Sequence, residues 1–454
     1  MKYIRRLLYA LLMGSMINYI PIFTLLYFLR STQISFHALI YWLSLLAAFV
    51  FINLCPLPNI VPIRRIQLLA EGCELLRLFL ITFVLSLIFQ VIWFRFLFTL
   101  AAGWSIAAMI LADVVLVILS LCILFWNGMI RVYLTSVQLG MKHRALGALC
   151  GWIPLVNVWY LVKIIHICSN EVEFETEKWE LDEVRAKSEI CKTKYPLLLV
   201  HGVFFRDFRY FNYWGRIPKA LIRNGATVYY GQQQSAASVE DSGRELAARI
   251  RQIVGESGCE KVNIIAHSKG GLDSRAAVAH CGMAPYVATL TTINTPHRGC
   301  IFAEYLLGKV PETVRKKIAA AYNATLKKVG DPNPDFLAAV TDLTERACLD
   351  RNQVTPDIPG VRYESVISYC KKARHGRFPL NMTWRFVRHF DGLNDGLVSV
   401  ESAKWGERMI LLEPMGKRGI SHGDVVDLNR ENIQGFDVRE FYVKLTADLK
   451  RRGY

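Results

Sequence analysis

The first 168 residues are dominated by long apolar runs, whereas the chain after residue 190 mixes apolar and polar positions as globular domains do. A run of about 20 apolar residues is long enough to cross the hydrocarbon core of a bilayer. Asp113 is the only charged residue within the four runs, and we expect it to face the interior of a helix bundle, because charge in lipid is costly. The pattern predicts an all-α membrane domain over residues 1–168 with four transmembrane helices. These runs are Leu7–Leu29, Phe36–Cys55, Leu78–Phe94 and Ser105–Trp126.

A fifth apolar segment, Ala145–Cys168, contains Pro154, Asn157 and Lys163 and could span the membrane, re-enter it or lie at its surface. Three clusters of basic residues flank the four runs, and the positive-inside rule assigns all three to the cytoplasm. Four crossings then leave the residues after 170 in the cytoplasm, and a fifth crossing would leave them outside. The clusters consist of Lys2, Arg5 and Arg6, of Arg64, Arg65 and Arg77, and of Arg131, Lys142 and Arg144.

Glu171–Glu189 is dense in acidic residues, and we interpret residues 169–192 as a solvated linker or exposed helix. Short apolar segments then alternate with helical patterns through a domain over 193–454, which indicates the α/β class: a mostly parallel sheet with helices on both faces. The expected strands are Tyr195–Val200, Ala226–Tyr230, Val262–Ala266, Val287–Ile293 and Met409–Leu412, and the expected helices are Tyr213–Asn224, Ser238–Glu256 and Gly271–His280.

The formal charge of +16 on 454 residues does not indicate nucleic-acid binding, because no motif interleaves basic and aromatic residues. Residues 1–168 contain 12 basic and 3 acidic residues, so membrane topology and attraction to anionic lipid account for much of the excess. The 11 cysteines are scattered and include no C-x-x-C pair, which argues against a zinc ribbon and favours a reducing compartment. We therefore expect the 193–454 domain on the cytoplasmic face.

Candidate chemistry begins at Ala266–Gly270, which reads Ala-His-Ser-Lys-Gly between an apolar strand and a helical pattern. This is the G-x-S-x-G nucleophile elbow with alanine in the first position. Small residues are needed two positions either side of Ser268 because the turn is tight, and the helix start supplies the Lys269 N–H to a developing oxyanion. The alternative is an ordinary serine at a glycine-rich helix start.

A nucleophilic serine needs a base and an acid, which follow it in the order acid and then histidine in this fold. His422 lies in a loop after the last expected strand, where it can reach over the end of the sheet. Asp395 lies in a turn between Ser268 and His422, and Asp391 is the second choice for the acid. The less suitable histidines are His280, which lies in a helix, His297, which is expected to shape a turn, and His375 and His389, which precede the acids.

The second oxyanion donor should follow the first strand. Gly202 allows the backbone to approach a substrate closely, so that the Val203 N–H can join that of Lys269. We interpret His201 as a structural hydrogen-bonding residue.

Together these segments resemble the bacterial true lipases, which are triacylglycerol lipases of the α/β-hydrolase superfamily. The resemblance covers about residues 195–445 and implies a triad of Ser268, Asp395 and His422, with oxyanion N–H groups from Val203 and Lys269. The N-terminal membrane region lies outside it. The segments that carry the resemblance are Pro196–Val203, Tyr213–Tyr229, Lys261–Gly271, Asn294–Gly299, Asn394–Val398 and His422–Asp424.

The resemblance also implies two further features, a structural calcium ion and a lid. Asp424 would be one calcium ligand, but residues 365–390 contain no Asp or Glu to supply the other, so we expect no metal or cofactor. Residues 301–345 correspond to the family's lid and have amphipathic spacing, with a break at Asp331–Pro334. This segment is either a mobile lid or a fixed cap.

The sequence as a whole predicts a membrane-anchored serine hydrolase that cleaves carboxylic esters of the acylglycerol type. Its expected partners are a lipid or other ester and the membrane, with no nucleic acid, and its expected location is a bacterial cell membrane that it crosses several times. The alternatives are an acyltransferase with the same triad and a non-catalytic scaffold with a hydrolase fold.

Overall fold

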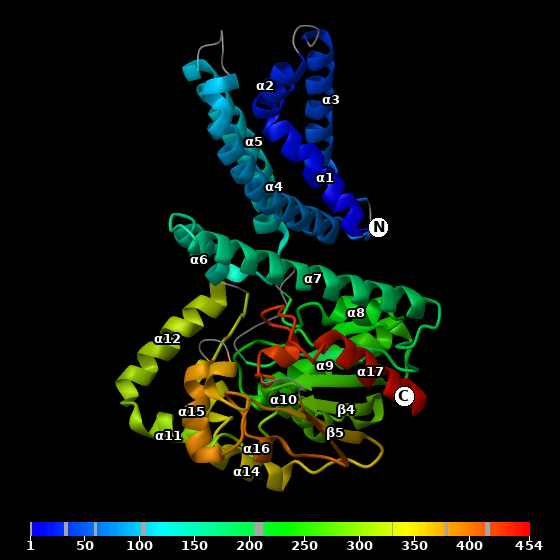
Figure 1. Cartoon of the computed structure of the whole chain (residues 1–454). Coiled ribbons are helices and arrows are strands. Elements are labelled where there is room, and N and C mark those ends of the chain that lie inside the picture. Colours follow the sequence, from blue (N-terminus) through cyan, green and yellow to red (C-terminus); the bar gives the residue numbers. More distant parts are fainter. Residues whose placement is uncertain are drawn as a thin grey trace. The chain divides into compact units, whose positions relative to one another are not determined.

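The computed structural model describes residues 2–30, 35–58, 61–100, 106–203, 212–328, 330–376, 380–413 and 418–454 (Figure 1). The chain forms two compact units, Met1–Trp179 and Glu180–Tyr454. The boundary falls within helix α7 (Val156–Ala186), so much of the acidic stretch expected as linker or exposed helix is helical.

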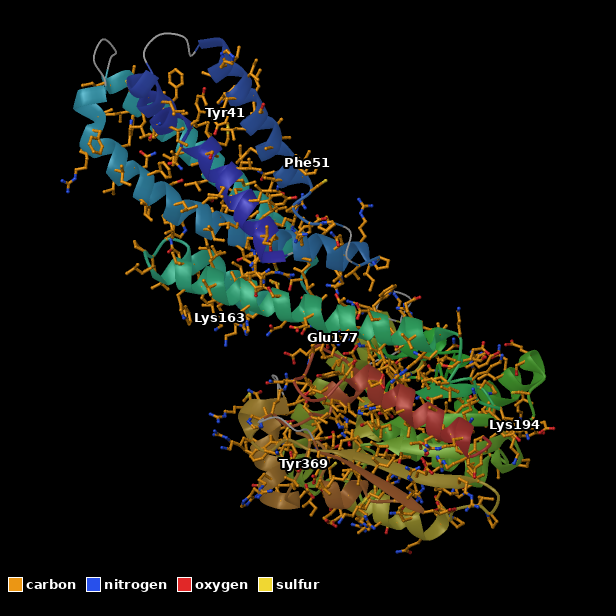
Figure 2. All side chains as sticks on the ribbon, turned by 45° about the vertical axis from the view of Figure 1, so that its right-hand side comes forward. Tyr41, Phe51, Lys163, Glu177, Lys194 and Tyr369 are labelled. Atoms are coloured by element: carbon orange, nitrogen blue, oxygen red, sulfur yellow. The ribbon has the colours of Figure 1, made fainter. Side chains whose placement is uncertain are left out.

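Helices are the only regular secondary structure in the described residues of the first unit. Three segments are long and apolar enough to cross a membrane: His37–Leu54, Arg64–Leu97 and Ile106–Thr135. Apolar side chains such as Tyr41 and Phe51 project from the surface of α3 (Figure 2), as expected for a helix in contact with lipid. Besides α7, the helices are α1 (Lys2–Ile17), α2 (Tyr19–Arg30), α3 (Ser35–Leu54), α4 (Arg64–Leu100), α5 (Ile106–Thr135) and α6 (Gly140–Cys150).

The run expected as a single helix over Leu7–Leu29 is a bent pair. The axes of α1 and α2 differ by 75°. Pro21 lacks an N–H group and its ring disfavours a continuous helix, so the backbone breaks a few residues before it. Asn18 lies at the break, and its side-chain amide donates a hydrogen bond to the Gly14 carbonyl at 2.8 Å. If this pair is one broken span, the unit has four candidate crossings rather than three.

Two other expectations for the membrane region have different outcomes. Asp113 is 2% exposed, which confirms that it faces the interior of the helical unit. Ala145–Cys168 is divided between α6 and α7 by a turn over 151–155, and it is not among the candidate spans in the described part of the chain.

Two buried glutamates of the first unit, Glu74 and Glu171, are held by arginines. Glu74 accepts hydrogen bonds from Arg6 at 2.6 and 2.8 Å, and Glu171 pairs with Arg65 at 2.6 Å. Glu171 also accepts the Ser136 hydroxyl at 2.6 Å and is 1% exposed. The expectation that the acidic stretch is solvated is therefore wrong at Glu171, whose carboxylate has enough donors to offset burial.

The second unit contains a six-stranded parallel sheet in the order β2-β1-β3-β4-β5-β6. This confirms the predicted α/β class, and all five expected strands agree with the structure to within two residues at each end. Arg362–Ser368 was not predicted as a strand. The strands are β1 (Leu197–Val200), β2 (Val228–Tyr230), β3 (Val262–His267), β4 (Val287–Ile293), β5 (Arg362–Ser368) and β6 (Arg408–Leu412).

Helices cover both faces of this sheet. Leu197 and Leu199 pack into a core with α8 (Ile217–Arg223) and α17 (Val438–Arg451). Leu198 and Val200 point to the other face, which carries α9 (Val239–Ser257) and α10 (Lys269–His280). This alternation explains why the strands are apolar throughout, because each side chain is buried on one face or the other.

The remaining helices lie after β4. Figure 1 shows α11, α12 and α15 together at one side of the unit. Residues 301–345 form three of these helices, and the break expected at Asp331–Pro334 separates α12 from α13. They are α11 (Ile301–Lys309), α12 (Glu312–Lys328), α13 (Phe336–Thr341), α14 (Glu345–Val354), α15 (Leu380–Asp391) and α16 (Val400–Ala403).

Candidate active site

Ser268 lies between the end of β3 and the start of α10, at the carboxyl edge of the sheet. Its backbone has φ 56° and ψ −132°, a region that non-glycine residues rarely occupy. The Ser268 N–H donates to the Ile293 carbonyl of β4 at 2.9 Å, which holds the turn in place. Backbone strain that the surroundings enforce in this way is a common feature of functional turns.

The glycines of this turn are required by close packing. A Cβ atom on Gly270 would lie 2.4 Å from the His201 carbonyl oxygen, and one on Gly271 would lie 2.2 Å from Thr295 Oγ1. Both distances are far below van der Waals contact, so no side chain fits where α10 crosses the neighbouring strands. This agrees with the small residues that the elbow pattern demands.

Asp395 and His422, which are 27 residues apart in sequence, are in direct contact. His422 Nδ1 lies 2.6 Å from Asp395 Oδ2, and the His422 N–H donates to the Asp395 carbonyl at 3.0 Å. The other carboxylate oxygen of Asp395 accepts the N–H groups of Leu397 at 2.9 Å and Val398 at 2.8 Å. The carboxylate is therefore fixed in orientation, with one oxygen directed at the imidazole.

Asp391, the alternative acid, lies at the start of α11 rather than beside His422. Its carboxylate faces the N–H groups of Ile301 and Phe302, at 3.4 Å each, where α11 begins. Burial raises the pKa of Asp391 above its ordinary value of 3.8. Among the described contacts, Asp391 has none to His422.

The other histidines are engaged elsewhere or exposed. His280 Nε2 lies 3.0 Å from Thr355 Oγ1, and His297 Nε2 lies 3.0 Å from Thr292 Oγ1. His201 is fully buried, and its ring nitrogens contact the carbonyl oxygens of Gly202 and Gln233 at 2.8 and 3.0 Å, a structural arrangement as predicted. His375 and His389 make no described contact with Ser268 or the Asp395–His422 pair.

No hydrogen bond joins Ser268 to His422 in the described part of the chain. His267, which precedes Ser268 in sequence, contacts the ring of His422. The rings of His267 and His422 have centroids 4.4 Å apart, and His267 Nδ1 lies 2.6 Å from the Tyr213 hydroxyl. Burial, together with the neighbouring His422, lowers the pKa of His267 well below 6.5, so this ring is neutral near pH 7. Sequence reasoning missed Tyr213 and His267, although His267 occupies the variable position of the elbow pattern.

The two expected oxyanion donors flank Ser268. A Cβ atom on Gly202 would lie 2.8 Å from Ser268 Cβ, so the loop carrying Gly202 and Val203 passes directly over the serine. Lys269 is the first residue of α10, and the N–H groups at a helix start have no partner within the helix. The Lys269 side chain is buried and binds Asp273 at 2.6 Å and the Ser242 hydroxyl at 3.1 Å.

Ser268 opens into an apolar cavity of about 370 Å³. Its walls come from α11, α12 and α13, from Val203, and from Leu397 and Val398 beside Asp395. A cavity of this size and character suits the apolar part of a small substrate. A larger cavity, of about 540 Å³, lies at the amino end of β5 around Arg362, away from the serine.

The surroundings of Asp424 do not fit a calcium site. Its carboxylate accepts the Ser421 hydroxyl at 2.7 Å and pairs with Arg418 at 3.0 Å. An arginine already supplies the positive charge that calcium would bring. The described residues contain no cluster of three or more His, Cys, Asp or Glu side chains that could hold a metal ion.

A strained serine after the third strand, a buried Asp–His pair and a parallel sheet with helices on both faces together define an α/β-hydrolase. Residues 223–329 match the family described as "Putative serine esterase (DUF676)". The triacylglycerol lipase of Vibrio cholerae is 31% identical over 217 residues, which cover 42% of this chain and 69% of that protein. The chain belongs to the triacylglycerol lipase family and is a carboxylic ester hydrolase.

Other similar proteins include a second bacterial lipase and a lipase of known structure. The triacylglycerol lipase of Pseudarthrobacter phenanthrenivorans is 35% identical over 175 residues, and the match covers 35% of this chain and 54% of that protein. The crystal structure of Staphylococcus hyicus lipase has 18% sequence identity and a TM-score of 0.45, with 57% of this chain and 96% of that chain covered.

Proposed function

We propose that the chain hydrolyses lipid esters at a triad of Ser268, His422 and Asp395. The contact of 2.6 Å between Asp395 and His422, close to a serine with a strained backbone, is the main support for this assignment. A carboxylate fixed by two backbone N–H groups is suited to orient an imidazole and to stabilise its charged form.

In this mechanism Ser268 Oγ attacks the ester carbonyl carbon while His422 Nε2 accepts the hydroxyl proton. The N–H groups of Val203 and Lys269 stabilise the oxyanion that develops. The tetrahedral intermediate collapses, the alkoxide leaves with the proton from His422, and an acyl group remains on Ser268. Water, activated by His422, then attacks the acyl-enzyme, releasing the fatty acid and restoring the serine.

The apolar cavity and the membrane-type helices support a lipid substrate. The matches cover 69% of the Vibrio relative and 54% of the Pseudarthrobacter relative, both of which are named as triacylglycerol lipases. We propose by this similarity that the substrate is a lipid ester. An enzyme anchored by several crossings would meet lipid esters without transfer of the substrate through water. We propose that residues 180–454 face the cytoplasm, because the basic clusters and the scattered spacing of the 11 cysteines favour that side.

Replacement of the nucleophile tests the proposal. Ser268→Ala should leave a folded protein that neither hydrolyses p-nitrophenyl butyrate nor reacts with a fluorophosphonate probe. Ser257→Ala, at the end of α9, is the matched control and should retain both. Hydrolysis by Ser268→Ala at the wild-type rate would refute the assignment. Folded wild-type protein that the probe does not label would favour a non-catalytic scaffold, and ester products with an added alcohol would reveal acyl transfer.

A further inference from the structure

One charged side chain lies in the wall of the apolar cavity that contains Ser268. Among the described lining residues, Arg315 is the only charged one and Ser268 supplies the only hydroxyl. Arg315 lies in the first turn of α12, and the wall residues before and after it in sequence, Val310 and Ile318, are apolar. A cation in such a wall is costly unless an anion accompanies it at some stage of function.

No described residue forms an ion pair with Arg315, although the charge of the guanidinium acts on the nearby Glu312 carboxylate. Its Nε atom is buried and has no hydrogen-bond partner in the described part of the chain. Glu312, three residues earlier, pairs with Lys316 at 2.7 Å. Glu304 accepts the Arg346 N–H at 3.1 Å, and the Asp391 carboxylate faces the start of α11. The acids nearest in sequence and in the surrounding helices therefore have other partners.

We propose that Arg315 forms an anion subsite and that the ester cleaved at Ser268 belongs to a glycerophospholipid, whose phosphate binds this guanidinium. This inference rests on the proposed function, because it names the substrate of the same site. In a glycerophospholipid the phosphate and the acyl esters share one glycerol backbone. A single molecule can therefore place an acyl chain against the apolar walls, an ester carbonyl at Ser268 and a phosphate at Arg315.

The subsite acts by discrimination. A neutral glyceride has no acceptor for Arg315 and would leave a buried N–H group unpaired in the complex. Unpaired polar groups in a site penalise the wrong substrate more than an added apolar contact rewards the right one. A guanidinium is also suited to phosphate because its planar donors can bind two oxygens at once.

The test compares two substrates on the full chain in a non-hydrolysable detergent. Dihexanoyl phosphatidylglycerol and dihexanoylglycerol have the same acyl chains and differ in the phosphate-bearing headgroup. The wild type should have the higher kcat/KM on the phospholipid. Arg315→Gln should lower that value by about tenfold or more and change the value for the neutral lipid less than about twofold. Arg315→Lys keeps the charge without the planar fork. Its kcat/KM on the phospholipid should lie between those of the wild type and Arg315→Gln.

Lys317→Gln is the control, because Lys317 lies close to Arg315 in the sequence of α12 but is exposed. This variant should leave kcat/KM unchanged for both substrates. The comparison separates binding in the cavity from general attraction of anionic lipid to α12. An equal loss on both lipids in Arg315→Gln, or no preference of the wild type for the phospholipid, would overturn the subsite. The proposed function would instead be overturned if the wild type did not hydrolyse p-nitrophenyl butyrate, or hydrolysed it no faster than Ser268→Ala.

Discussion

The rings of His267 and His422 lie against each other with centroids 4.4 Å apart, and the Tyr213 hydroxyl contacts His267 Nδ1 at 2.6 Å. A neutral ring packed on the proposed base limits the orientations that the base can adopt. We therefore predict that His267 and Tyr213 are positioning residues, which act through His422 rather than on the substrate.

Removal of the tyrosine hydroxyl tests this role. Tyr213→Phe should lower kcat roughly three- to tenfold with little change in KM, because one hydrogen bond that orients His267 is lost while the substrate cavity is intact. Steady-state kinetics on p-nitrophenyl butyrate provide the measurement. A change confined to KM would show that Tyr213 shapes substrate binding instead.

Replacement of each candidate acid by asparagine should have a different effect on activity. Asp395→Asn should lower kcat by about 10³- to 10⁴-fold, because an amide in place of the carboxylate favours the wrong tautomer of His422. Asp391→Asn should keep most of the activity and lower the melting temperature slightly, since only the start of α11 is affected. The reverse pattern would assign the acid to Asp391.

The buried pair of Lys269 and Asp273 should make stability depend on pH. Burial raises the pKa of Asp273 from 3.8 to about 7, with Lys269 opposing the shift. The folded state then binds more protons than the unfolded chain between these values, so the contribution of Asp273 to stability falls as pH rises from about 4 to 7.

Asp273→Asn removes this titration. The melting temperature of the wild type minus that of the variant should therefore decrease as pH rises from 4 to 7, measured by thermal unfolding in detergent. A difference that increases over the same interval would show that the ion pair with Lys269 outweighs burial.

Close packing at the elbow predicts a sharp contrast between two glycines. Gly270→Ala should lower stability by at least about 2 kcal/mol, because its Cβ would meet backbone atoms that cannot move aside. Gly255→Ala, within α9, has no atom within 4 Å of the added Cβ and should raise stability by about 0.5–1 kcal/mol. Thermal unfolding of the two variants checks both signs.

The side of the membrane can be assigned with a thiol probe, and the structure determines which cysteine is useful. Cys191 and Cys370 are 0% and 1% exposed, so a maleimide would not reach them in the folded protein. A chain that retains only Cys259, which is partly exposed, should react with a membrane-impermeant maleimide after lysis but not in intact cells. Reaction before lysis would place residues 180–454 outside.

The sequence predicted the elements whose signal is local. The elbow strand, the start of α10 and the turn at Asp395 each follow from spacing within a few residues. Strand β5 was missed because it contains Glu364, which is 3% exposed and forms an ion pair with Arg452. A partner 88 residues away cannot be inferred from local alternation.

The same limit applies to the candidate site. Ser268, Asp395 and His422 could be proposed from motif and chain order, whereas the contacts of His267 and Tyr213 depend on tertiary distance. Arg315 looks like an ordinary basic residue on an amphipathic helix until the cavity wall is known. By contrast, the bend at Asn18 had a local signal in Pro21, which the length of the apolar run concealed.

The packing around Gly202, Gly270 and Gly271 also bears on how this chain can diverge. The hydrogen atoms of these glycines face atoms of other segments, so the contacts that pack these segments together also hold the proposed nucleophile in place. Ser268, in contrast, contributes no described side-chain hydrogen bond to the fold. If Ser268 is the nucleophile, as proposed, a lineage can lose catalysis in one substitution and keep a stable domain free to acquire a binding role, whereas loss of Gly270 removes both properties together.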